Sequence, residues 1–201
     1  MNSYKEFEKL IAYYCAPTIV GLKPANLLAC KIENSILEQQ MRLFHKELST
    51  SSIHIKSLAH KKSWSILFIY NMPLLERQLC NSKVQSYLAN LGYPCTLKLD
   101  DMLQYLSYRI HRSYEYPHEI GLFLGYPYED VLGFIKHQGR HYKICGYWKV
   151  YVNEKETLEL FEEYSRCRTF LYHQIIEGFT LGDLHTLYSS QTNELHKNML
   201  E

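Results

Sequence analysis

The sequence predicts an α+β fold, with a single helix-rich domain packed on a small mixed or antiparallel sheet of three to four strands. Apolar residues recur at helical spacing in most segments of the chain. A few short runs are instead almost continuously apolar, as expected of buried strands. Because these runs do not alternate regularly with the helical segments, the pattern favours α+β over a doubly wound parallel sheet.

The expected domain spans residues 1–188 and is followed by a polar, frayed tail over residues 189–201. The chain has 201 residues, of which 46% are hydrophobic and 21% are charged. This composition is typical of a folded globular protein, and the length suits one domain.

The first helix is expected to end at a proline. Ser3 and Glu6 form an S-x-x-E capping box, and apolar residues follow at helical spacing. Pro17 should end the helix because the residue before a proline is pushed out of the α region. Residues 15–24 then contain two prolines and a glycine, a pattern typical of an apolar, constrained connection.

The predicted sheet is built from short apolar runs. Residues 26–32 can form a buried strand, residues 53–55 alternate as a strand does, and residues 63–70 form the strongest strand candidate. The almost continuous apolar character of residues 63–70 predicts a central strand that is covered on both faces. Residues 141–152 are expected to form one further strand, with a bulge or a close approach at Gly146.

The remaining helices are predicted from apolar stripes and from their boundary residues. Prolines fall at the first turn of two of them, and acidic residues fall in the first turn of a third. Their expected ranges are 33–48, 73–91, 100–110, 127–135 and 154–177.

Charge and cysteine spacing limit the classes of partner. The formal net charge is +1, from 22 basic and 21 acidic residues, so we expect no nucleic-acid partner. The sequence contains no run of about 18 apolar residues, so we expect no membrane span. The six cysteines form no C-x-x-C pair and no zinc-like spacing, so we expect no metal ion. The polar N-terminus is no secretory signal, and we expect reduced thiols in a cytoplasmic protein.

The densest candidate segment runs from residue 117 to residue 134. Gly121 and Gly125 lie there among bulky apolar residues, which indicates close approach of another element or of a ligand. His118 is a candidate general acid or base, and Glu119 offers a carboxylate beside it. The alternative is that Glu119 caps a helix and that His118 bonds locally. The glycines match neither a dinucleotide fingerprint nor a phosphate-binding loop.

Two further candidates lie in residues 15–24. Cys15 is a possible nucleophile, although the C-terminal end of a helix disfavours a thiolate, and a buried structural cysteine is the alternative. Lys23 can hold an anionic group of a ligand, or simply reach solvent.

Tyrosine enrichment adds a third group of candidates. The chain has 18 tyrosines, and half of them lie between residues 105 and 151. On a strand over residues 146–151, Tyr147, Lys149 and Tyr151 would share one face, which would form one wall of a pocket together with Tyr126. The alternative is a core whose periphery is built from amphipathic aromatic residues.

Three motifs resemble a known family. They are CAPTIVGLKPANL at residues 15–27, PHEIGLFLGYPYEDV at 117–131 and GYWKVY at 146–151. Together they resemble the bacterial family of domain of unknown function 3793, which occurs chiefly in anaerobic Firmicutes. The resemblance covers nearly the whole chain and implies a stand-alone cytoplasmic domain, but it implies no activity and no cofactor.

The leading hypothesis is a small-molecule-binding protein, and an enzyme that uses His, Cys and Lys chemistry is one form of it. The competing hypothesis is a regulatory or interaction module that binds another protein or a second copy of itself. A third hypothesis is haem or metal binding through Cys and His. An exposed apolar patch over residues 122–134, with no pocket, would favour the interaction module.

Overall fold

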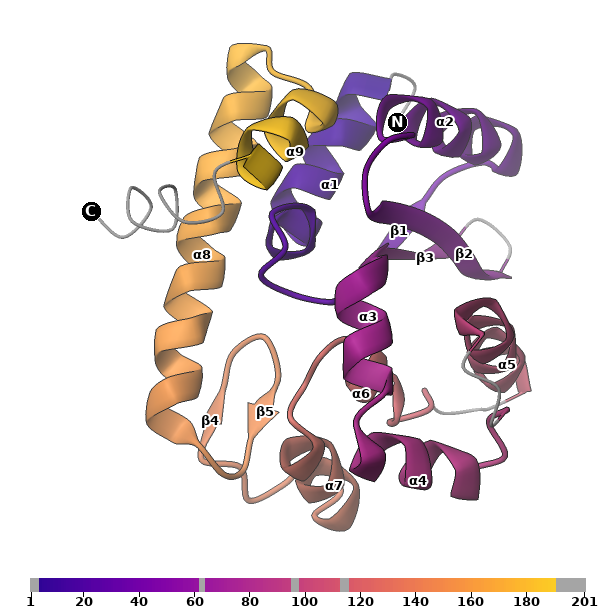
Figure 1. Cartoon of the computed structure of the whole chain (residues 1–201), viewed down its shortest axis with the longest axis vertical. Coiled ribbons are helices and arrows are strands. Elements are labelled where there is room, and N and C mark those ends of the chain that lie inside the picture. The colour runs from indigo at the N-terminus through magenta and orange to yellow at the C-terminus, as the bar shows by residue number, and fades with distance from the viewer. Residues whose placement is uncertain (1–3, 62–63, 95–97, 113–115, 191–201) are drawn as a thin grey trace.

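The computed structural model describes residues 4–61, 64–94, 98–112 and 116–190 (Figure 1). Ser3, which belongs to the expected capping box, lies outside these ranges. So does the expected tail, except for residues 189 and 190, which end the last described helix.

The described elements confirm the predicted α+β class. The strands are β1 at Ala25–Lys31, β2 at Ile53–Lys61, β3 at Trp64–Asn71, β4 at Ile144–Cys145 and β5 at Lys149–Val150. The helices are α1 at Tyr4–Ile19, α2 at Asn34–Glu47, α3 at Met72–Leu79, α4 at Ser82–Asn90, α5 at Leu99–Arg112, α6 at Ile120–Phe123, α7 at Tyr128–Lys136, α8 at Glu154–Glu177 and α9 at Leu181–Ser190. Within the described ranges, no helix is both long enough and apolar enough to cross a membrane.

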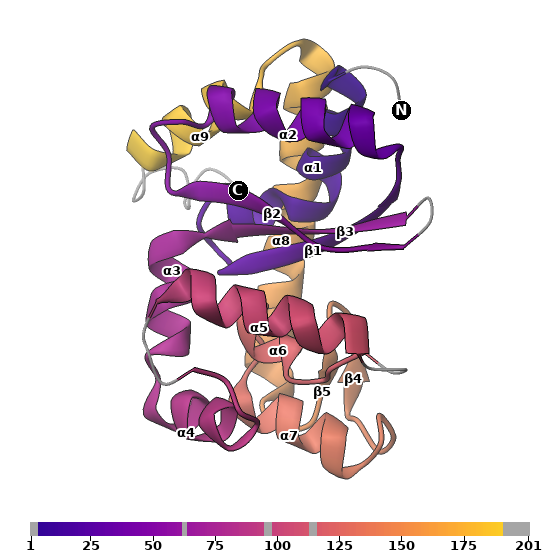
Figure 2. The ribbon, with the colours of Figure 1, turned by 90° about the vertical axis from the view of Figure 1, so that its right-hand side faces the viewer.

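The main sheet is antiparallel and lies between two layers of helices. Its strand order is β1-β3-β2, so the predicted central strand is confirmed. Leu67 and Ile69 of β3 pack into a core shared with α1, α2, α8 and α9, whereas Phe68 and Tyr70 pack into a second core with α3 to α7. Figure 2 shows the sheet edge-on, with α2 and α9 on one side and α4 to α7 on the other.

The longest helix, α8, runs past both layers (Figure 2). Its C-terminal half packs on the first core through Cys167 and Leu171. Its N-terminal half packs on a third, smaller cluster through Phe161 and Tyr164, beneath the β4–β5 hairpin. The hairpin and the N-terminal segment of the chain are therefore held against the same helix.

The prediction that Pro17 ends the first helix is wrong. Helix α1 continues to Ile19, because its last turn is buried and tertiary packing outweighs the local preference of the residue before a proline. The carbonyl oxygen of Pro17 then accepts hydrogen bonds from the backbone N–H groups of Leu22, at 2.8 Å, and Lys23, at 3.0 Å. The constrained connection is thus the tight turn that follows the helix.

Two other element predictions are corrected. Residues 73–91 form two helices, because the side chain of Asn81 accepts hydrogen bonds from the backbone N–H groups of Lys83 and Val84 and so starts α4. Residues 141–152 form the two-stranded hairpin β4–β5 in place of one strand. The hairpin turns at Gly146, where an added Cβ atom would lie 2.4 Å from the ring of Phe161.

Candidate functional site

The three sequence motifs meet at one cavity of about 320 Å³, which we call the Lys23 cavity. It lies where the end of α1, the start of β1, the link between α6 and α7, the hairpin turn and α8 come together. Its polar and aromatic walls are made by Tyr13, Tyr14, Lys23, Asn26, Tyr126, Tyr147 and Arg168. Among the described residues that line it there is no Asp or Glu.

The loop that carries Lys23 is fixed at both ends. The backbone N–H of Lys23 donates to Pro17, and the carbonyl oxygen of Pro24 accepts from the backbone N–H of Asn71 at 2.8 Å. Beside the cavity, the hydroxyl of Thr18 donates to the side-chain oxygen of Asn26 at 2.7 Å. The lysine therefore projects from a rigid turn.

Lys23 is a buried cation with no acidic partner among the described residues. The residue is 3% exposed, and its ammonium group lies 5.2 Å from the ring centre of Tyr126. No ion pair between the described residues includes it. Burial lowers the pKa of Lys23 to about 8, an effect that the neighbouring Cys15 thiol opposes. At pH 7 this side chain is still mainly protonated, and it reaches its protonation midpoint at about pH 8.

Tyr126 forms the wall beneath the ammonium group. Its ring stacks on the indole of Trp148, with ring centres 4.8 Å apart, and its hydroxyl donates to the carbonyl oxygen of Tyr147 at 3.3 Å. Burial raises the pKa of Tyr126 to about 12, so the phenol stays neutral. The wall supplies an aromatic face to the cation and no negative charge.

Arg168 of α8 brings a second cation to the same cavity. Its guanidinium carbon lies 5.0 Å from the ring centre of Tyr13 and 5.9 Å from that of Tyr147. In the part of the chain that the structure describes, no carboxylate is paired with it. Two unpaired cations and several aromatic rings therefore face one small volume.

A second cavity, of about 330 Å³, adjoins the first and is mainly apolar; we call it the His118 cavity. Tyr126 and Tyr147 line both cavities. His118, Gly121, Cys145 and Lys149 also line this second cavity. Five of the predicted ligand-binding residues thus line two neighbouring cavities that share a tyrosine wall: Lys23, Gly121, Tyr126, Tyr147 and Lys149.

His118 and Lys149 have modest contacts in that cavity. The exposed imidazole of His118 meets the ring of Phe134 edge-on, at 4.9 Å between ring centres. The ammonium group of Lys149 donates to the carbonyl oxygen of Gly139 at 2.7 Å and lies 4.9 Å from the ring centre of Tyr142. Lys149 therefore stabilises the loop after α7, and it is less available to a ligand than Lys23.

Glu119 points away from both cavities. It is 4% exposed and forms an ion pair with Nε of Arg109, while the hydroxyl of Tyr93 donates to the same carboxylate at 3.1 Å. These contacts tie the start of α6 to α5 and to the turn after α4. The Arg109 and Tyr93 contacts satisfy the buried carboxylate of Glu119, and neither of them involves His118.

Cys15 is fully buried in the first core and lines neither cavity. Burial raises the pKa of its thiol to about 12, and nearby Lys23 offsets only part of that rise. The thiol is therefore protonated at neutral pH, and a nucleophilic role has no support from the geometry. Cys15 and His118 lie in different environments, so the structure does not bring them together as a dyad.

Tyr151 also lies outside both cavities. Its ring stacks on the imidazole of His137, with centres 5.7 Å apart, and covers Gly133, where an added Cβ atom would lie 2.5 Å from it. The three residues predicted to share a strand face therefore separate. Tyr147 reaches both cavities, Lys149 reaches one, and Tyr151 packs on α7.

Asp130 holds the hairpin against α7. It lies in the first turn of α7, and its carboxylate accepts hydrogen bonds from the indole N–H of Trp148 at 2.8 Å and from the backbone N–H groups of Tyr151 at 2.7 Å and Val152 at 3.2 Å. This contact positions Trp148 and hence the ring of Tyr126 that stacks on it.

Gly125 holds the second motif against the first. It has a φ of +77°, and an added Cβ atom would lie 2.5 Å from the ring of Pro24, next to Lys23. Gly121 is similarly close to Val131 and Tyr126, at 2.9 and 3.0 Å. These glycines allow the close approach of backbone to side chain that places Tyr126 beside the Lys23 loop.

We expect Gly125→Ala to lower the free energy of unfolding by roughly 2–5 kcal/mol, from the left-handed backbone and the contact with Pro24. The matched control is Gly178→Ala, because Gly178 has a φ of +113° but nothing within 4 Å of an added Cβ atom. Urea denaturation of both variants measures the difference. Equal losses would show that the approach to Pro24 adds no constraint.

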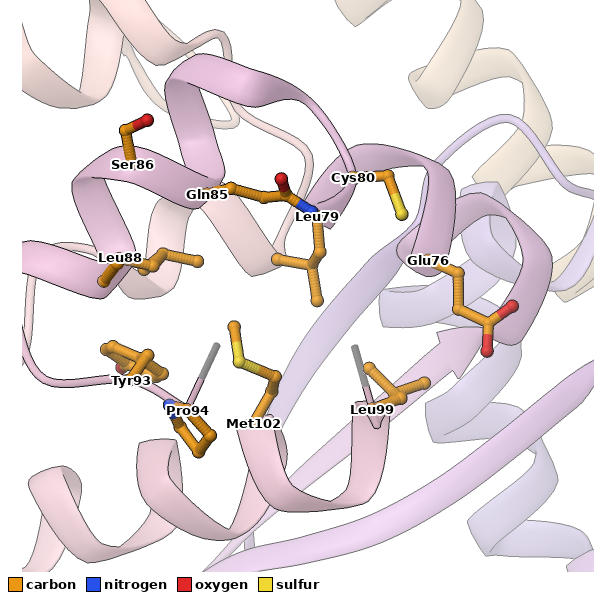
Figure 3. A pocket seen from close by; sticks show the side chains of 11 residues that line it. Glu76, Leu79, Cys80, Gln85, Ser86, Leu88, Tyr93, Pro94, Leu99 and Met102 are labelled. Carbon is orange, nitrogen blue, oxygen red and sulfur yellow. The ribbon is translucent and has the colours of Figure 1, made fainter. Parts of the chain in front are cut away.

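A larger cavity, of about 560 Å³, lies between α3, α4 and α5 (Figure 3). Leu79, Leu88, Tyr93 and Met102 point into it. The connection from Pro94 to Leu99 includes residues 95–97, which lie outside the described ranges. The described residues that line this cavity include no Lys or Arg, in contrast to those of the Lys23 cavity.

Sequence reasoning missed Arg168 and Asn26. Arg168 lies on a long helix with many exposed charges, and nothing in the local sequence distinguishes it from them. Asn26 lies on the strand that follows the Lys23 loop, and its polarity within an apolar run was the one available signal. Over the described ranges, no group of three or more His, Cys, Asp or Glu side chains is placed to hold a metal ion.

The chain matches no curated protein and no solved structure. A family model matches residues 11–185, a span that contains all three motifs around the Lys23 cavity. The protein belongs to the family described as Protein of unknown function (DUF3793).

Proposed function

We propose that this protein binds a small anionic molecule in the Lys23 cavity, with Lys23 and Arg168 as its charged partners. The observation that carries the proposal is the burial of Lys23 at 3% exposure beside a cavity, with no acidic partner within the described ranges. A lysine in such a position is costly for the folded state, because burial disfavours the charged form. A bound carboxylate or phosphate would supply the missing acceptor and offset that cost.

The shape of the cavity supports a small ligand. Its volume of about 320 Å³ is at the lower end of the range typical of small-molecule sites, roughly 300–1,000 Å³. The rings of Tyr13, Tyr126 and Tyr147 add apolar surface to the two cations. The ligand we propose is therefore an anion with a short carbon skeleton.

The competing interaction-module hypothesis has less support. Leu122 and Phe123 are fully buried, and the segment that contains them borders cavities. The apolar residues that would have formed a docking patch are thus largely part of the core. We keep a small molecule as the proposed partner.

We also propose that the protein acts in a bacterial cytoplasm. The described cysteines at positions 15, 30, 80, 145 and 167 carry free thiols, and two of them are exposed. Exposed free thiols fit a reducing compartment.

The test is thermal unfolding with acetate, lactate, pyruvate, succinate and inorganic phosphate as probes. A probe at about a hundred times its dissociation constant should stabilise the protein by about 2.7 kcal/mol, which raises the melting temperature by roughly 5–11 °C. Lys23→Met should weaken binding by roughly 10- to 100-fold, because a charged hydrogen bond is lost. Lys46→Met, at an exposed position in α2, is the control and should bind as the parent does.

Binding should also weaken as the pH rises from 7 to above 9. The ammonium group of Lys23 loses its proton around pH 8, and an anion that favours the charged form then loses one partner. The Cys15 thiol and the Tyr126 phenol beside Lys23 stay neutral over most of this interval, and the cation Arg168 lines the same cavity. If no probe stabilises the parent protein more than Lys23→Met, the proposal is wrong.

A further inference from the structure

We propose that Lys23 is a nucleophile as well as an anion partner, and that its amine condenses with the carbonyl carbon of a small oxo acid whose carboxylate is bound by Arg168. This inference rests on the proposed function, since it assigns a reactive group to the same anionic ligand. It names the substrate class: a short carboxylic acid that carries a ketone or an aldehyde.

The surroundings of Lys23 fit an amine that reacts. Lys23 and Arg168 reach the same cavity from different elements, one from the turn after α1 and the other from α8. A ligand whose carboxylate pairs with the guanidinium group would have the rest of its skeleton inside the cavity, toward the lysine. The lysine side chain packs on the ring of Tyr126, so its approach is restricted and its nitrogen is largely shielded from water.

The protonation states of Lys23 and of the groups beside it also fit this role. No carboxylate pairs with Lys23 in the described part of the chain, so no anion holds the proton on its nitrogen. Burial lowers the pKa of Lys23 to about 8, which leaves a useful fraction of free amine near neutral pH. The facing Cys15 thiol and Tyr126 phenol both keep their protons. The lysine nitrogen is therefore the available nucleophile among these three groups.

The reaction is a condensation that releases water. The lone pair of the neutral amine attacks the carbonyl carbon, the carbonyl π electrons move to oxygen, and one proton passes from the nitrogen to that oxygen to give a carbinolamine. The nitrogen then loses its second proton and forms a double bond to the same carbon, while the hydroxyl group leaves with that proton as water. The products are an imine and one water molecule, with no oxidant or reductant involved.

The experiment is borohydride trapping with pyruvate, acetoacetate and levulinate, which place the ketone one, two or three bonds from the carboxylate carbon. Borohydride delivers hydride to the imine carbon and leaves a stable secondary amine on the lysine. We expect intact-mass spectrometry to show one reduced adduct with at least one of these acids. Peptide mapping should place that adduct on Lys23.

Two comparisons make the result specific. Lactate, which has no ketone, should bind without forming an adduct, and Lys23→Arg should keep the positive charge but lose the adduct. Arg168→Met should lower the trapped fraction at a fixed oxo acid concentration by roughly tenfold or more, through loss of the carboxylate partner. The trapped fraction for Arg168→Met should recover as the oxo acid concentration is raised.

The outcomes separate this inference from the proposed function. If thermal unfolding shows that these acids bind at Lys23 but no adduct forms there, the condensation is wrong and the anion site stands. An adduct spread over exposed lysines in proportion to their number would also overturn it. If the oxo acids do not react and none of the anion probes binds at Lys23, both proposals fail.

Discussion

Lys23→Met should raise the free energy of unfolding at pH 7 by about 3 kcal/mol. The ordinary pKa of a lysine is 10.5, and burial lowers that of Lys23 to about 8. This difference corresponds to about 3 kcal/mol of destabilisation when the lysine is charged in both the folded and the unfolded chain. Methionine has a similar length and needs no proton, so it fills the same space without that cost.

The difference in the free energy of unfolding between Lys23→Met and the parent should depend on pH. Below pH 8 the lysine is protonated in both states, and the full cost of burying the charge is present. Between pH 8 and 10.5 the unfolded chain holds a proton that the folded chain has released, so the stability of the parent rises with pH. The advantage of Lys23→Met should therefore shrink over this interval and vanish by its upper end.

Urea denaturation of the parent and the variant at pH 7 and at about pH 10 measures both effects. Lys46→Met, at an exposed position in α2, controls for the loss of a positive charge and should change stability by less than about 0.5 kcal/mol. A Lys23→Met protein less stable than the parent at pH 7 would mean that the lysine stabilises the fold. Such a result would remove the main reason for assigning it to a ligand.

Asp130→Asn should lower the free energy of unfolding by roughly 2–4 kcal/mol. The carboxylate accepts the indole N–H of Trp148 with one oxygen and two backbone N–H groups with the other. An amide has only one oxygen, so its NH₂ group would face at least one buried donor and leave it unsatisfied. Asp130 is 2% exposed, which prevents water from replacing the lost acceptor.

The matched control is Asp100→Asn. Asp100 pairs with Lys56 at 3.0 Å on the surface, so its loss should cost less than about 1 kcal/mol. Urea denaturation compares the two variants. A double-mutant cycle of Asp130→Asn with Trp148→Phe should show coupling, because the phenyl ring has no N–H to satisfy. Independent effects of the two changes would contradict the proposed hydrogen bond.

The sequence predicted best the elements whose pattern of apolar residues is long and uninterrupted. Helix α8 has the predicted ends, residues 154 and 177, because its apolar stripe repeats over many turns. The central position of β3 followed from its almost continuous apolar run. Both features depend on burial patterns that a linear sequence displays directly.

The hairpin could not be predicted in the same way. Strands β4 and β5 have two residues each, too few for a recognisable period. The turn between them exists because Gly146 lies against the ring of Phe161, which is a contact between distant parts of the sequence. Gly146 was recognised as a site of bulging or close approach, but the chain reversal itself depends on tertiary structure.

The candidate site, too, was predicted from the sequence only in part. Lys23, Tyr126 and Tyr147 were expected to bind a ligand, and the structure places all three around one cavity. Cys15 was grouped with them because it lies in the same constrained connection as Lys23, residues 15–24, yet its side chain enters the core. Arg168 reaches the cavity from a helix more than a hundred residues after Lys23 in the sequence, so only the fold reveals it. Whether any of these residues binds a ligand stays a prediction.

The position of α8 has a consequence for folding. The hydroxyl of Tyr164 on this helix donates to the carbonyl oxygen of Leu22, at 3.5 Å, and Arg168 lies one turn further along beside the cavity. The cavity is therefore assembled from parts with high sequence separation, and such contacts form late because a long loop must close first. A ligand that bridges Lys23 and Arg168 would slow the separation of α1 from α8 during unfolding. Its binding would then be visible as simultaneous protection from hydrogen exchange in α1 and α8.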